Sequence, residues 1–108
     1  MNEIIEETKA IFRKFKDDGS IIAMFPKELG TNSPYTCECY MHIGQHSTCD
    51  PVYVIQMTKL AKSEEYQYLK KELESISYKL KIIKRYQDSH LERREEQLKQ
   101  RTHNNEML

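Results

Sequence analysis

The stretch that decides the fold is residues 11–26, IFRKFKDDGSIIAMFP. Residues 11–16 alternate between two faces of a strand, since successive side chains in a strand point to opposite sides. The turn that follows contains Gly19, which adopts a positive φ at no steric cost. The apolar, β-branched run Ile21–Phe25 supplies a second strand. The stretch therefore predicts a β-hairpin that ends near Phe25, because Pro26 cannot donate a hydrogen bond to a sheet.

Residues 35–43, YTCECYMHI, predict a third strand. Its odd-numbered residues, which include Cys37 and Cys39, are the more apolar set and are expected to face the core. The even-numbered residues, which include Tyr40, are expected on the opposite face. Residues 44–49 are polar and predict a turn.

Two helices and a last strand are expected in the second half. Asp50 before Pro51 is typical of a helix start, although the β-branched residues of 52–60, VYVIQMTKL, leave a strand as the alternative. Ser63 is expected to cap a longer helix. The apolar stripe of that helix consists of Tyr66, Leu69, Leu73 and Ile76. The period changes to two over residues 78–83, which predicts a strand.

This order of elements predicts an α+β fold. We expect a small, mostly antiparallel sheet of about four strands, formed by the hairpin, the third strand and the C-terminal strand, with one or two helices packed on one face. Residues 1–86 would form this single domain. Residues 87–108 are nearly all charged or amide and predict a charged tail, helical or disordered. Pairing of two such tails would give a homodimer.

Metal-binding side chains crowd into the segment that follows Tyr35. They are Cys37, Cys39, His42, His46 and Cys49. A zinc site needs four tetrahedral ligands, and the single residue between Cys37 and Cys39 leaves too little chain to turn around an ion. The metal hypothesis therefore uses His42, His46 and Cys49, with Asp50 as an oxygen alternative and zinc as the ion. The alternative is a protein without a cofactor whose cysteines pack as small apolar residues.

Cys49 also suggests nucleophilic catalysis. It lies just before the expected helix N-terminus, which lowers the pKa of a thiol. His42 or His46 would act as the base, oriented by Asp50. The sequence contains no phosphate-loop pattern, and a binding protein is favoured over an enzyme.

Basic residues follow two of the predicted strands. The first set is Arg13, Lys14 and Lys16, and the second is Lys79, Lys81, Lys84 and Arg85. If the strands are neighbours, these residues form a positive patch interleaved with Tyr78 and Tyr86, which is typical of proteins that bind single-stranded nucleic acid. The alternative is a solvated sheet face with lysines at its edge.

The chain has 17 basic and 17 acidic residues, which argues against an acidic DNA mimic and against a strongly basic nucleic-acid coat. No apolar run approaches the ~20 residues of a membrane span. We therefore expect a soluble, cytoplasmic protein whose three cysteines are thiols or metal ligands.

The balance favours a small cytosolic regulatory protein that binds another protein. The seven tyrosines are a residue type enriched at protein interfaces, and the charged tail fits an interaction segment. An inhibitor of a host system, encoded by a phage or a mobile element, would have these properties.

Three segments, Ile11–Pro26, Tyr35–His46 and Glu64–Ile82, resemble a family of small uncharacterised bacterial and phage proteins with an H-x-G-Q-H segment. The resemblance implies a core domain that ends near Arg85. It also draws attention to Tyr40, His42, Gly44, Gln45 and His46. We predict a binding site that consists of Tyr40, His42, Gln45 and His46. The family pattern includes neither Cys39 nor Cys49, so it adds no support to a thiolate-rich zinc site.

Overall fold

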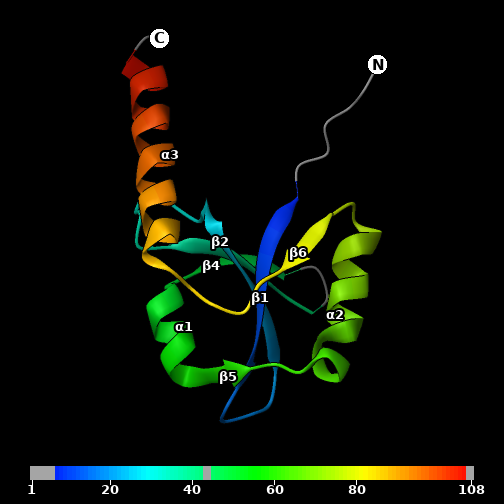
Figure 1. The fold of residues 1–108 in the computed structure, drawn as a ribbon. Helices are drawn as coiled ribbons and strands as arrows, with labels where there is room; N and C mark the ends of the chain where they lie inside the picture. Colours follow the sequence, from blue (N-terminus) through cyan, green and yellow to red (C-terminus); the bar gives the residue numbers. More distant parts are fainter. Residues whose placement is uncertain (1–6, 43–44, 107–108) are drawn as a thin grey trace.

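The computed structural model describes residues 7–42 and 45–106, which form an α+β fold with a six-stranded sheet (Figure 1). The elements are β1 (Thr8–Phe15), β2 (Ile21–Leu29), β3 (Cys37–Met41), β4 (Gln45–Cys49), α1 (Pro51–Met57), β5 (Thr58–Leu60), α2 (Ser63–Ser75), β6 (Leu80–Ile82) and α3 (Asp88–Glu106). The α+β class, the mostly antiparallel sheet and the C-terminal helix are confirmed. The sheet has six strands rather than about four.

The sheet is organised around β1. Its hydrogen-bonded order is β4-β3-β2-β1-β5, and all of these neighbours are antiparallel. The outer edge of β1 is shared by two short strands. β5 pairs with its second half, where Arg13 lies opposite Leu60, and β6 runs parallel to its first half, where Lys9 lies opposite Lys81.

The predicted hairpin is present as β1 and β2. Gly19 has a φ of 75° in the connecting turn, and Lys14 lies opposite Ile21 at its mouth. The prediction that the second strand ends near Phe25 is wrong, because β2 continues to Leu29. The register shifts between Phe25 and Leu29, and this irregularity accommodates Pro26, which has no N–H to donate.

β3 is followed directly by a fourth strand. Cys37 and Cys39 are buried in the core, as predicted. The prediction of a polar turn over residues 44–49 is wrong for its described part, because residues 45–49 form β4. This strand lies at the edge of the sheet with mostly exposed side chains. It therefore carries no apolar alternation from which it could be predicted.

Helices cover both faces of the sheet rather than one. The first core contains Ala10, Phe12, Ile21, Ala23, Phe25 and Tyr40 of the sheet with Leu69 and Leu73 of α2. The second core contains Ile11, Ile22, Met24, Cys37 and Cys39 with Val54 of α1. Figure 1 shows α2 on one side of the sheet and α1 and α3 on the other. Tyr40, expected on the less buried face, is therefore only 1% exposed.

The helix starts are set by carboxylates. Asp50 caps α1 as predicted, and its Oδ1 accepts hydrogen bonds from the backbone N–H groups of Val52 (2.9 Å) and Tyr53 (3.4 Å). α2 begins at Ser63 with Lys62, not Ser63, at the N-cap, where a Glu65 carboxylate oxygen accepts the Lys62 N–H (2.8 Å). Both alternatives for residues 52–60 hold in part, because the helix ends at Met57 and the strand β5 follows.

α3 is anchored to the sheet by a buried cation. Arg94 is 1% exposed and donates to the carbonyl oxygens of Pro26 (2.6 Å) and Pro34 (2.8 Å) and to the Tyr86 hydroxyl (2.7 Å). The division into a domain of residues 1–86 and a tail of residues 87–108, and the pairing of two tails, stay predictions. No helix among the described residues is long and apolar enough to cross a membrane.

Candidate functional site

A polar corner lies where the end of β3 meets α2. The Tyr40 hydroxyl donates to one Glu72 carboxylate oxygen, and the His42 Nδ1 lies 2.7 Å from the other. The His42 ring also meets the Tyr68 ring edge to face, with centroids 5.6 Å apart. Glu72 therefore fixes two residues that the sequence predicted as a binding site. An imidazole oriented by a carboxylate in this way is suited to proton transfer.

His46 extends the corner from the neighbouring strand β4. It lies opposite Tyr40 in the sheet register, and the two rings are in edge contact at 4.7 Å. The His46 Nε2 lies 2.9 Å from the Tyr78 hydroxyl. Gln45 is exposed one position earlier in β4, and Gly44 lies outside the described residues.

The predicted metal ligands are divided between the two faces of the sheet. His46 faces the α2 side with Tyr40, whereas Cys49 packs in the second core opposite Cys37, with the two sulfur atoms 3.7 Å apart. Asp50 is engaged in capping α1. No three or more His, Cys, Asp or Glu side chains in residues 7–42 and 45–106 are arranged to hold a metal ion. The zinc hypothesis and its cofactor-free alternative both stay predictions.

The Cys49 thiol is protected rather than activated. A hydrogen bond with the Cys37 thiol is the main cause that raises the pKa of Cys49 to about 12. A hydrogen bond with Cys39 opposes it, and burial adds to the rise. Sequence reasoning expected a lowered pKa from the start of α1, and this expectation is wrong. The thiolate that a nucleophile requires is disfavoured at neutral pH, which weakens the catalytic hypothesis.

The predicted basic residues of β1 are engaged in internal contacts. Arg13 donates to the Thr58 side chain and backbone, both at 2.9 Å, and to the Ile55 carbonyl at 3.2 Å. Lys14 forms an ion pair with Glu65 at 2.5 Å. Lys16 donates to the Gln56 carbonyl at 3.4 Å. These three cations fasten β1 and the residue that follows it to α1, β5 and α2.

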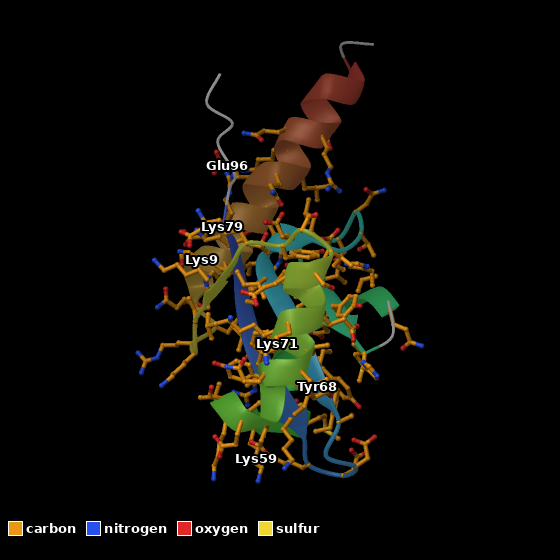
Figure 2. The ribbon with its side chains drawn as sticks, turned by 90° about the vertical axis from the view of Figure 1, so that its right-hand side faces the viewer. Lys9, Lys59, Tyr68, Lys71, Lys79 and Glu96 are labelled. Atoms are coloured by element: carbon orange, nitrogen blue, oxygen red, sulfur yellow. The ribbon has the colours of Figure 1, made fainter. Side chains whose placement is uncertain are left out.

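The second basic set meets two further lysines at the other end of β1. Lys81 of β6 lies directly opposite Lys9, and Lys9 contacts Lys27 of β2. We call the resulting group the basic face. It consists of Lys9, Lys27, Lys79, Lys81, Lys84 and Arg85. Figure 2 shows Lys9 and Lys79 on one flank of the molecule, with Lys59 far below them and Lys71 on α2.

Positive charges of the basic face act on one another. Lys27 has a lowered pKa, mainly because of its close side-chain contact with Lys9, with burial and the charges of Lys9 and Arg93 adding to the effect and Glu28 opposing it. The ion pairs among described residues join Lys14 to Glu65, Lys70 to Glu74, Arg93 to Glu96 and His42 to Glu72. None of these ion pairs includes a member of the basic face. Because no carboxylate among the described residues pairs with these cations, their charges add up to a positive local potential.

Aromatic rings do not interleave with these cations as predicted. Tyr78 stacks on Phe25 with centroids 5.2 Å apart and bonds to His46. Tyr86 packs against His90 and Arg94. Both tyrosines are only partly exposed, and their rings are engaged inside the fold.

Sequence reasoning did not identify Lys9, Lys27 or His90 as part of this region. The positions of Lys9 and Lys27 can be deduced from the hairpin register, in which Ile11 lies opposite Met24. Extension of that register by two positions carries Lys9 to the neighbourhood of Lys27. His90 carries no comparable signal, because its position depends on how α3 packs against the sheet.

Comparison of the chain with protein-family models, with curated proteins and with solved structures found no match. The resemblance to small bacterial and phage proteins therefore stays a prediction, and the functional argument depends on the geometry described above.

Proposed function

We propose that this protein binds nucleic acid through the basic face, by contacts to phosphate groups rather than to bases. The observation that carries the proposal is the parallel pairing of β1 and β6, which sets Lys9 and Lys81 side by side. Like charges placed opposite each other in a sheet are unfavourable. A row of phosphates relieves this repulsion and releases counterions.

The engaged rings of Tyr78 and Tyr86 support phosphate contacts over base stacking. Binding through phosphates alone is independent of sequence and suits duplexes as well as single strands. The balanced net charge of the whole chain implies that binding depends on this local group and on orientation, and that it weakens with added salt.

Fluorescence anisotropy with a labelled duplex, measured from about 50 to about 200 mM salt, tests the proposal. If all six cations of the basic face contact phosphates, the logarithm of the binding constant should fall with that of the salt concentration with a slope of about −5. Replacement of Lys79 and Lys81 by alanine should reduce the slope by about 2. Binding that does not change with salt, or an unchanged slope in this variant, would contradict the proposal.

Lys59 and Lys71 provide matched controls. Both are exposed and lie away from the basic face (Figure 2). Their replacement by alanine removes the same formal charge from the chain, and the slope should remain that of the unmodified protein. An equal loss of slope in the control would mean that only net charge matters.

A protein-binding regulator, expected from the sequence, is the second candidate. It is favoured by a group of exposed apolar side chains on α1 and β5. Their exposed fractions are 54% for Val52, 57% for Tyr53, 42% for Met57 and 42% for Leu60. Lys16 bonds to the end of α1 and Lys59 precedes Leu60, so the partner that fits this surface is an acidic segment with spaced apolar residues.

A displayed peptide library tests this second candidate. Acidic amphipathic peptides should be enriched, and the double replacement Tyr53→Ala, Met57→Ala should abolish the enrichment. Enrichment of basic peptides, or binding that survives the double replacement, would argue against it. A cytosolic setting and an origin in a phage or mobile element belong to this proposal as its expected context.

A further inference from the structure

A cavity of about 460 Å³ opens between the first half of β1, the segment after β6 and the start of α3. It is lined by Lys9, Ile82, Ile83, Lys84, Arg85, Gln87 and His90. The volume lies within the range of pockets that hold small ligands. Three of the lining residues belong to the basic face, so the cavity is a hollow within that surface.

His90, which lines this cavity, carries a hydrogen-bond donor. The ring is buried, with 3% exposure, and its Nδ1 accepts the Gln87 backbone N–H at 2.9 Å. A backbone N–H can only donate, so the Nδ1 carries the lone pair and the neutral ring holds its proton on Nε2. Burial, followed by the charges of Lys27, Lys9 and Arg94, lowers the pKa of His90 and favours this neutral form.

The Nε2–H has no hydrogen-bond acceptor within the described part of the chain. Among those residues, every fully buried side-chain nitrogen or oxygen atom has a partner. The Nε2 therefore is not fully buried, and His90 is one of the residues that line the cavity. A neutral donor surrounded by cations favours an anion and disfavours a metal ion.

Further positive charge comes from around the cavity. Lys27 contacts the lining residue Lys9, and Glu28 is the acidic residue that acts on Lys27. α3 is 19 residues long, and its N-terminus, where the helix dipole is positive, begins beside Gln87. Ammonium, guanidinium and imidazole donors from separate elements match the several oxygen atoms of a phosphate group.

We propose that this cavity binds a terminal phosphate group, a monoester that carries close to two negative charges. The proposal rests on the nucleic-acid function and deepens it, because a terminal phosphate carries more charge than an internal one. The same chemistry is offered by a free phosphate-bearing small molecule, and the experiment separates the two sources.

Inorganic phosphate is the first probe, added to the full chain at constant ionic strength against chloride. The ring resonances of His90, followed by NMR, should shift in a saturable way. The double replacement Lys84→Ala, Arg85→Ala changes exposed residues and should weaken this binding at least tenfold, whereas Lys71→Ala should not. A shift that is linear, or equal with chloride, would overturn the proposal.

Oligonucleotides with a 5′-phosphate or a 5′-hydroxyl form the second arm. Tighter binding of the phosphorylated strand, lost in the double variant, supports nucleic acid as the source. Saturable phosphate binding without oligonucleotide binding supports the cavity with a small ligand and refutes the nucleic-acid function. Equal binding of both oligonucleotides without phosphate binding refutes the cavity and leaves that function intact.

Discussion

Replacement of Arg94 by alanine should be among the most destabilising single changes in this protein. The guanidinium is 1% exposed and donates to the carbonyl oxygens of Pro26 and Pro34 and to the Tyr86 hydroxyl. The bond to Pro26 is buried and the other two are part-buried. An acceptor left unsatisfied costs about 2–3 kcal/mol when buried and about 1 kcal/mol when water has partial access. The three acceptors together therefore predict a loss of about 4–5 kcal/mol in the free energy of unfolding.

Urea unfolding followed by circular dichroism measures this loss. The adjacent Arg93 is the control, because its nearest carboxylate, on Glu96, lies 3.9 Å away and both side chains are about half exposed. Arg93→Ala should change the free energy of unfolding by less than about 0.5 kcal/mol. Equal values for the two variants would refute the reasoning that α3 is fastened by Arg94.

Three other predictions concern the β3–β4 region. Gly30→Ala should lower the free energy of unfolding by about 1–3 kcal/mol in a urea titration, because an added Cβ would lie 2.7 Å from the nearest heavy atom. Cys49 should react slowly with iodoacetamide in the folded chain, because the pKa of its thiol is raised to about 12. The reaction rate should rise with pH up to about that value. A rate that levels off at about pH 7 would contradict this prediction. Thermal unfolding should show that Glu72→Ala destabilises the protein by about 1–2 kcal/mol, since buried Tyr40 loses an acceptor. His42 is exposed, so His42→Ala should lower the stability by under about 0.5 kcal/mol. Equal effects of the two replacements would contradict this reasoning.

Local signals predicted the elements that depend on local chemistry. The turn at Gly19 and the cap at Asp50 follow from backbone geometry and side-chain hydrogen bonds within a few residues. Buried Cys37 and Cys39 follow from alternation in a strand. β4 was missed because an exposed edge strand needs no apolar pattern. The burial of Tyr40 was missed because it depends on α2, which packs against that face from more than twenty residues away.

The candidate sites show the same limit. The polar turn predicted over residues 44–49 placed His46 and Cys49 together, but the observed strand β4 puts them on opposite faces of the sheet. The two strands predicted to carry basic residues are neighbours, but the two basic sets are not, because β6 pairs with the first half of β1 whereas Arg13 and Lys14 lie in its second half. Their division into engaged and unpaired cations depends on contacts with residues up to 51 positions away, such as that of Lys14 with Glu65, and no local pattern carries that information.

The shared outer edge of β1 has a consequence for the order in which the chain folds. β2 follows β1 immediately, whereas the parallel partner β6 arrives about 70 residues later. Closure of so long a loop is slow, and fold formation is limited by such distant pairings. During synthesis, the edge of β1 at Thr8–Ala10 therefore waits for β6 to be made. In that interval the hydrogen-bonding groups at this edge are accessible to other chains, and we expect misfolding and aggregation to begin there.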